Sequence, residues 1–235
     1  MKNVILITLL FCLTFEGNSQ KNIQKKSTQK PVIDIYYNVP FVPQPTGFSC
    51  WSSSMSMILW WCKNNKSEKS FQSSLSPREV AFELDYYKQY YQNGLDVLDK
   101  NAFDHFGFVK IPNTFTSQKV DYYVNLIKKG PIWIAYNGCE NPVRNCGHSV
   151  VWVGLKGDGT HEGTKVIVHD PDDGSGQYPN QGIRNYEMTL KEFEERLAYL
   201  AIGVVKSNRN VNSKNICYMA YKDCNKKWFE TNPAR

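Results

Sequence analysis

A glutamine and a cysteine stand six residues apart near the start of a serine-rich run, as Gln44 and Cys50 followed by Trp51. A cysteine attacks a carbonyl carbon as a thiolate, so a reactive cysteine needs surroundings that favour the anion. The small and then apolar residues after position 48 predict a buried helix that begins near Ser49. The N-terminus of such a helix favours the anion, and the Gln44 amide with the Cys50 N–H could hold an oxyanion. A buried structural cysteine is the alternative.

A histidine that could act as a base opens an apolar strand, as Gly147-His148-Ser149 followed by valines and a tryptophan. At the mouth of the core its ring can be half exposed and titrate near neutral pH. A core histidine whose hydrogen bonds are satisfied is the alternative interpretation. Three other histidines are weaker candidates, because they lie between helices, in a turn and directly before an acid: His105, His161 and His169.

An acid to orient this histidine follows from a predicted β-hairpin. Residues 148–155 and 165–170 are expected to pair as antiparallel strands about a glycine-rich turn centred near Gly159. In that register His148 and Asp170 are direct cross-strand neighbours on one face, and the carboxylate can accept the imidazole N–H. A slip of one residue would place the two side chains on opposite faces. Two further carboxylates are the fallback candidates: Asp172 and Asp173.

The remaining pattern predicts helices first and strands mostly afterwards, which is typical of the α+β class. A capping box with proline at the first helical position predicts a helix over 76–90. Two more helices are expected over 118–129 and from Thr189 onward, and further strands over 132–136 and 201–205.

Taken in order, these motifs resemble papain-like cysteine peptidases. Gln44, Cys50-Trp51 and the later Gly147-His148 are similar to the family as a whole. Other motifs resemble a bacterial branch that includes secreted effector proteases: Val39-Pro40, Gly130-Pro131-Ile132-Trp133, Gly157-Asp158-Gly159-Thr160 and His169-Asp170-Pro171. The resemblance covers about residues 38–205. Serines at 52–54, where alanines are common, and a cysteine pair just before His148 depart from it.

The resemblance implies a two-lobed papain-like fold, with an N-terminal helical lobe and a C-terminal antiparallel β-sheet lobe. It implies Cys50 as nucleophile, His148 as base, Asp170 as orienting acid and Gln44 as oxyanion donor. We therefore expect a cysteine peptidase that hydrolyses peptide bonds in protein or peptide substrates through a thioester, with no metal or other cofactor. Two alternatives stay open. One is a peptidoglycan amidase or endopeptidase that uses the same triad, and the other is a non-catalytic binding module on this scaffold.

The first residues predict export. Lys2, the apolar stretch 4–15 and the small residues Gly17 and Ser19 are typical of a signal peptide cleaved near Ser19, which indicates a secreted or periplasmic protein. Twelve apolar residues are too few to span a bilayer, so no stable membrane anchor is expected. Four segments follow from this: a signal peptide over 1–19, a disordered linker or short pro-segment over 20–35, a peptidase domain over 36–205 and a C-terminal extension over 206–235.

The spacing of the cysteines indicates which of them could form disulfides or bind a metal. In an oxidising compartment the close pairs Cys139/Cys146 and Cys217/Cys224 are expected to form local disulfides. Cys62 shares the predicted helix with the candidate nucleophile, and twelve helical residues separate them by about 18 Å, too far for a bridge. No metal-ligand spacing indicates a zinc site.

The net charge of +6 comes without basic runs interleaved with aromatics, which argues against nucleic acid as a partner. The oligomeric state is left open.

Overall fold

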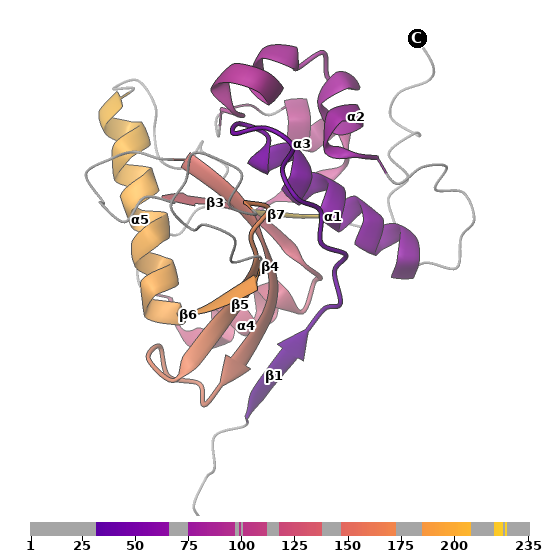
Figure 1. The fold of residues 1–235 in the computed structure, drawn as a ribbon. Coiled ribbons are helices and arrows are strands. Elements are labelled where there is room, and N and C mark those ends of the chain that lie inside the picture. Colours follow the sequence, from indigo (N-terminus) through magenta and orange to yellow (C-terminus); the bar gives the residue numbers. More distant parts are fainter. Residues whose placement is uncertain are drawn as a thin grey trace, which may run out of the picture.

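The computed structural model of this chain is an antiparallel sheet with helices on both faces (Figure 1). It describes residues 32–65, 75–96, 99, 101–111, 118–137, 147–172, 185–207, 219–222 and 224. The strands are β1 (Ile33–Tyr36), β2 (Phe108–Lys110), β3 (Ile132–Asn137), β4 (Gly147–Gly157), β5 (Thr164–His169), β6 (Asn185–Thr189) and β7 (Met219–Lys222). They lie in the order β2-β7-β3-β4-β5-β6, and β1 pairs with β4.

The helices divide between the two faces of the sheet. They are α1 (Cys50–Asn65), α2 (Pro77–Phe82), α3 (Asn101–His105), α4 (Val120–Ile127) and α5 (Leu190–Ser207), with a π-helical turn η1 (Gln89–Asn93). Trp133 of β3 faces α1, because its indole N–H donates to the carbonyl of Trp51 at 3.2 Å. Trp152 pairs with the neighbouring position Ile132 and therefore faces the other side, where its ring meets that of Tyr123 of α4 at 6.3 Å.

Large apolar side chains fill both layers between helix and sheet. Trp51, Trp133 and Trp152 are each at most 1% exposed, and every residue of β3 is buried. A strand that is apolar on both faces must be covered on both. The sequence therefore forces the central strands between two layers of helices. Among the described residues, no helix combines the length and the apolar character needed to cross a membrane.

Several predicted elements are confirmed, including the α+β class. Helix α1 begins at Cys50, one residue after the predicted start. The capping box at Ser76 is formed, since its hydroxyl accepts the N–H of Glu79 while the Glu79 carboxylate accepts the N–H of Ser76. The equivalent exchange between Thr189 and Glu192 begins α5.

Two predicted elements near helix ends are wrong. The predicted strand 201–205 belongs to α5, because a short apolar run fits a helix and a strand equally well and here continues an existing helix. The predicted helix 76–90 is broken after Phe82. Asp85 there adopts a left-handed φ of 57°, and η1 then resumes helical structure.

Two strands of the sheet extend beyond residues 36–205. Strand β1 begins at Ile33, inside the predicted linker 20–35, and pairs with the outer end of β4. Strand β7 lies in the predicted C-terminal extension 206–235, yet it pairs with both β2 and β3. A short strand carries little periodic signal of its own, so its place in the sheet is decided by partners far away in the sequence.

The disulfide of the described residues joins Cys62 at the far end of α1 to Cys224 after β7, with Cα atoms 5.4 Å apart. The predicted Cys217–Cys224 bridge is therefore wrong. Closeness in sequence suggested that pair, whereas β7 carries Cys224 to the helix. Cys139, Cys146 and Cys217 lie outside the described residues, and Cys50 is free. A bridge that closes so long a loop stabilises a fold by roughly 2–5 kcal/mol.

Candidate active site

Cys50 stands at the first turn of α1, where the preceding loop is held in a fixed shape. The hydroxyl of Ser49 accepts the N–H of Thr46 at 2.9 Å, and the carbonyl of Ser49 accepts the first helical hydrogen bond from Ser53 at 3.0 Å. Cys50 is 7% exposed. Its sulfur therefore lies at the positive end of a helix dipole, close to N–H groups that have no carbonyl partner within the helix.

The serines that follow Cys50 attach the helix to its surroundings. The hydroxyl of Ser53 donates to the carbonyl of Pro43 at 3.3 Å, and the hydroxyl of Ser54 donates to the carbonyl of Ser149 at 3.0 Å. The first bond holds the loop before Cys50, and the second holds strand β4 beside its histidine. Small side chains also let a helix approach a sheet closely, which explains serines where alanines were expected.

His148 and Asp170 form a buried pair. The Nε2 atom of His148 lies 2.6 Å from Oδ1 of Asp170, and the two side chains are 1% and 0% exposed. The side chain of Cys50 also helps to raise the pKa of this imidazole, so the sulfur lies near the ring. The structure thus brings together three residues that are widely separated in the sequence.

The pair forms although the predicted register is wrong. Observed partners are Val151 with His169 and Gly157 with Thr164, so His148 is not directly opposite Asp170. The register shifts between Trp152 and Gly154, as a β-bulge produces. Without this shift, alternation along the strands would place residues 148 and 170 on opposite faces. With it, the two residues share one face as diagonal neighbours.

The charges around His148 favour its protonated form. Burial alone lowers the pKa of His148, but the Asp170 carboxylate and its hydrogen bond, with a smaller contribution from Cys50, outweigh it and raise the pKa well above the ordinary 6.5. The backbone N–H of Asp172 also donates to Oδ1 of Asp170, at 2.9 Å. The site is therefore built to hold an imidazolium beside a carboxylate.

Gln44 lies in the loop before α1 and is joined to the loop after β5. Its backbone N–H donates to the carbonyl of Pro171, directly after Asp170, at 2.8 Å. The residue is 2% exposed, and neither its amide nitrogen nor its amide oxygen has a hydrogen-bond partner among the described residues. Buried amides normally are hydrogen-bonded. An amide in this state is available to a group that arrives from outside.

The other candidate residues have different surroundings. Asp172 is buried and contacts Asp170 through its backbone, while Asp173 lies outside the described residues. Burial lowers the pKa of His169 to about 4, and its ring packs against Phe41. The remaining two histidines face other partners: His161 bonds to the carbonyl of Gln118 at 2.7 Å, and His105 packs on Phe106.

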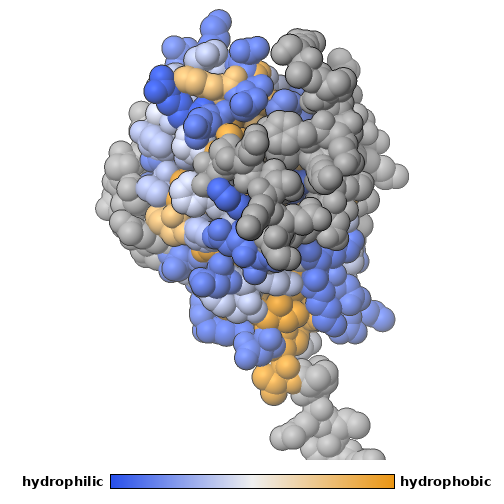
Figure 2. Space-filling view, turned by 90° about the vertical axis from the view of Figure 1, so that its right-hand side faces the viewer, coloured by the Kyte–Doolittle hydropathy of each residue, from blue (hydrophilic) through white to orange (hydrophobic). Residues whose placement is uncertain are grey.

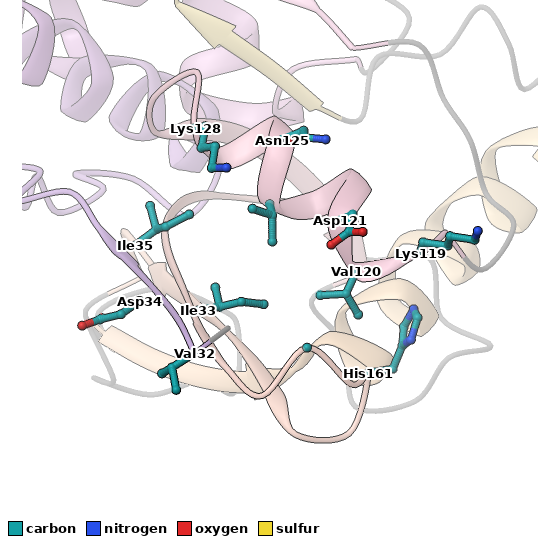
Figure 3. A pocket seen from close by; sticks show the side chains of 12 residues that line it. Val32, Ile33, Asp34, Ile35, Lys119, Val120, Asp121, Asn125, Lys128 and His161 are labelled. Carbon is teal, nitrogen blue, oxygen red and sulfur yellow. The ribbon is translucent and has the colours of Figure 1, made fainter. Parts of the chain in front are cut away.

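A separate cavity of about 920 Å³ lies between β1, α4 and the turn that follows β4 (Figure 3). Its lining includes Ile33, Val120 and His161, and it includes none of the four predicted site residues. Figure 2 shows apolar surface at the end of the molecule where β1 begins, in keeping with an exposed fraction of 83% for Val32. Within the described part of the chain, no cluster of histidine, cysteine or acidic side chains could hold a metal ion.

Comparison with known proteins agrees with this architecture. Residues 32–198, well over half of the chain, match the family described as papain-like cysteine protease AvrRpt2, and none of the curated proteins compared with the chain matches it. The matched segment runs from the start of β1 into α5 and contains all four predicted site residues. The fold is papain-like, and the protein is a cysteine-type peptidase, a hydrolase that acts on protein substrates. The chain belongs to the family of the papain-like cysteine protease AvrRpt2.

The charge of Asp170 is expected to control the protonation of His148. In Asp170→Asn the carboxylate is lost while burial remains, so the pKa of His148 should fall below 6.5. An NMR titration of the imidazole measures this, with the exposed carboxylate variant Asp121→Asn as the control that leaves the titration unchanged.

The raised pKa of His148 also makes the stability of the fold depend on pH. Because the pKa of His148 is raised by folding, its protonation stabilises the native state fully below about pH 6.5, and this contribution is lost as the pH rises through the raised value. Chemical denaturation at a series of alkaline pH values should show this loss in the wild type and not in Asp170→Asn, where the lowered pKa leaves His148 neutral in both the folded and the unfolded state at these pH values. Equal slopes in the two proteins would contradict the assignment.

Proposed function

We propose that the protein hydrolyses peptide bonds with Cys50 as nucleophile, His148 as general base and acid, and Asp170 as the residue that orients the imidazole. One observation carries this proposal: a single buried imidazole lies 2.6 Å from Asp170 through Nε2, and both Asp170 and the Cys50 side chain raise its pKa. A nucleophile, a base and an orienting acid in contact are the requirements of acyl transfer.

We assign a nitrogen to each step. Because Nε2 is bound to Asp170, Nδ1 is the nitrogen that remains to exchange protons with Cys50. The Cys50 thiol gives its proton to Nδ1, and the thiolate attacks the substrate carbonyl carbon to form a C–S bond. Nδ1 then donates that proton to the departing amine as the C–N bond breaks, which leaves a thioester. Water then attacks the thioester carbon and gives a proton to Nδ1, the C–S bond breaks to release the carboxylic acid, and the Cys50 thiolate recovers that proton.

The proposed oxyanion donors are the Gln44 side-chain amide and the Cys50 backbone N–H. The Gln44 amide is buried and has no partner among the described residues, so no existing hydrogen bond must break when a tetrahedral intermediate forms. Donors fixed before the reaction stabilise the developing charge without reorganisation. The bond from the Gln44 N–H to Pro171 fixes this loop relative to the segment that carries Asp170.

We also propose that the protein is exported and that its leader is removed near Ser19. Support comes from the apolar stretch after Lys2 in the sequence and from the Cys62–Cys224 disulfide, because such bridges persist in oxidising compartments.

Substituting the nucleophile should abolish turnover while the fold survives. Cys50→Ala is expected to lose roughly 10⁴- to 10⁶-fold in kcat on a protein substrate, because no other described thiol lies free. Ser56→Ala is the matched control: this serine is buried in the same helix, and its hydroxyl has no hydrogen-bond partner among the described residues. Turnover that survives in Cys50→Ala would remove the nucleophile assignment.

Removing the Gln44 amide should cost activity without costing stability. Gln44→Ala and Gln44→Glu are each expected to lower kcat by roughly 10²- to 10³-fold with little change in KM, since the donor acts on the transition state. Thermal unfolding of Gln44→Ala should stay within a few degrees of the wild type, because the side chain makes no hydrogen bond among the described residues, whereas the buried carboxyl group of Gln44→Glu should lower the Tm as well. A purely structural glutamine would show the reverse pattern, with a lower Tm and an unchanged kcat.

Export predicts a defined N-terminus. The protein recovered from outside the cytoplasm should begin near Gln20, with the leader absent. N-terminal sequencing or intact mass measures this directly. Recovery of the chain with Met1 and the apolar stretch still attached would contradict leader cleavage.

A further inference from the structure

The ring of Tyr136 lies beside the imidazole of His148. Tyr136 in β3 is the direct cross-strand partner of His148 in β4. The two ring centroids are 6.1 Å apart, and the ring planes stand at 88°, an edge-to-face arrangement. Tyr136 is fully buried. The sequence predicts only a buried strand over residues 132–136, since nothing in a run of apolar residues indicates which one will stand opposite a histidine.

The Tyr136 ring is itself held from two other directions. Its hydroxyl is hydrogen-bonded to the hydroxyl of Tyr186 on β6. The guanidinium of Arg196, on α5, lies 5.5 Å over the centre of the ring. A ring that is anchored at its hydroxyl end and covered on its face cannot easily move aside. The Tyr136 ring therefore restricts movement of the imidazole on one side.

The imidazole of His148 must keep one orientation if it is to act on both Cys50 and Asp170. A hydrogen bond to a ring nitrogen lies in the ring plane, so a rotation of the ring breaks the bond to Asp170 and turns the other nitrogen away from its direction toward the Cys50 side chain. An aromatic neighbour in edge-to-face contact limits that rotation, and aromatic rings also attract a cation. We propose that Tyr136 is a positioning residue that holds the His148 imidazolium in the one orientation that reaches both partners.

The charged and titratable groups around His148 come from several elements. Asp170 and Asp172 follow β5, Cys50 begins α1, and the Arg196 cation of α5 lies behind the Tyr136 ring. Asp170 is the group that bonds to the imidazole and raises its pKa. Loss of the Tyr136 ring would let the imidazole leave this carboxylate, so the imidazolium should lose its proton at lower pH.

The proposal assigns the effect to the ring and not to its hydroxyl. Tyr136→Leu removes the ring, whereas Tyr136→Phe keeps it and removes only the hydrogen bond to Tyr186. Tyr186→Phe removes that same bond from the other side. Phe193→Leu is the matched control for a lost buried aromatic, because Phe193 is fully buried and its ring packs on those of Trp152, at 5.6 Å, and Tyr123, at 6.3 Å.

The experiment measures the rate of Cys50 alkylation by iodoacetamide against pH, together with kcat and KM on a protein substrate. The alkaline limb of the alkylation profile reports the loss of the imidazolium proton. In Tyr136→Leu this limb should move down by about one pH unit, and kcat should fall roughly 10- to 100-fold with KM nearly constant. Tyr136→Phe, Tyr186→Phe and Phe193→Leu should keep the wild-type limb and stay within a few-fold in kcat.

An unchanged alkaline limb in Tyr136→Leu would overturn the proposal, as would an equal shift in Phe193→Leu. If Tyr136→Leu does not fold, Tyr136→Met, which keeps more of the volume, is measured by the same criteria. The catalytic part of this inference rests on the proposed function, but the alkylation profile needs no peptide substrate. A wild type without turnover would therefore count against the proposed function alone, while the alkylation limb still decides the role of Tyr136.

Discussion

The buried pair of His148 and Asp170 is the constraint on which the rest of the structure depends. An imidazolium and a carboxylate out of contact with water are costly unless each satisfies the other in good geometry. In this structure Nε2 of His148 lies 2.6 Å from Oδ1 of Asp170, and the backbone N–H of Asp172 donates a second hydrogen bond to the same oxygen. Small displacements of the strands that carry the two residues would leave an unpaired buried charge. The sheet must therefore be rigid at this point.

The surrounding elements supply that rigidity and place the sulfur. Trp133 and Ser54 bind α1 to the sheet through two hydrogen bonds, so the start of the helix cannot slide past β4. The loop before Cys50 is held to the loop after β5 through Gln44 and Pro171. At the other end of α1 the Cys62–Cys224 bridge fixes the helix to the chain after β7. A helix held at both ends presents its first residue to the imidazole without a conformational search.

The sequence predicted much of the site because its signals are local. The start of α1 follows from the run after Ser49. The predicted hairpin also places His148 and Asp170 on one face, although in the actual pairing they share a face only through the register shift between Trp152 and Gly154. The register was wrong because a glycine-rich turn fits several centres, and no residue type marks the bulge between Trp152 and Gly154. The disulfide partner of Cys224 and the place of β7 could not be predicted, since both depend on pairings between residues more than eighty positions apart.

The central claim is that Cys50 is a nucleophile whose reactivity depends on His148. Treatment with a peptidyl epoxide that traps cysteine nucleophiles, followed by peptide mass spectrometry, tests it most directly. The account predicts an adduct on Cys50 in the wild type and a rate of adduct formation at least about 10²-fold lower in His148→Ala, because the base that forms the thiolate is gone. An adduct on a different residue, or equal labelling of Cys50 in His148→Ala, would contradict it.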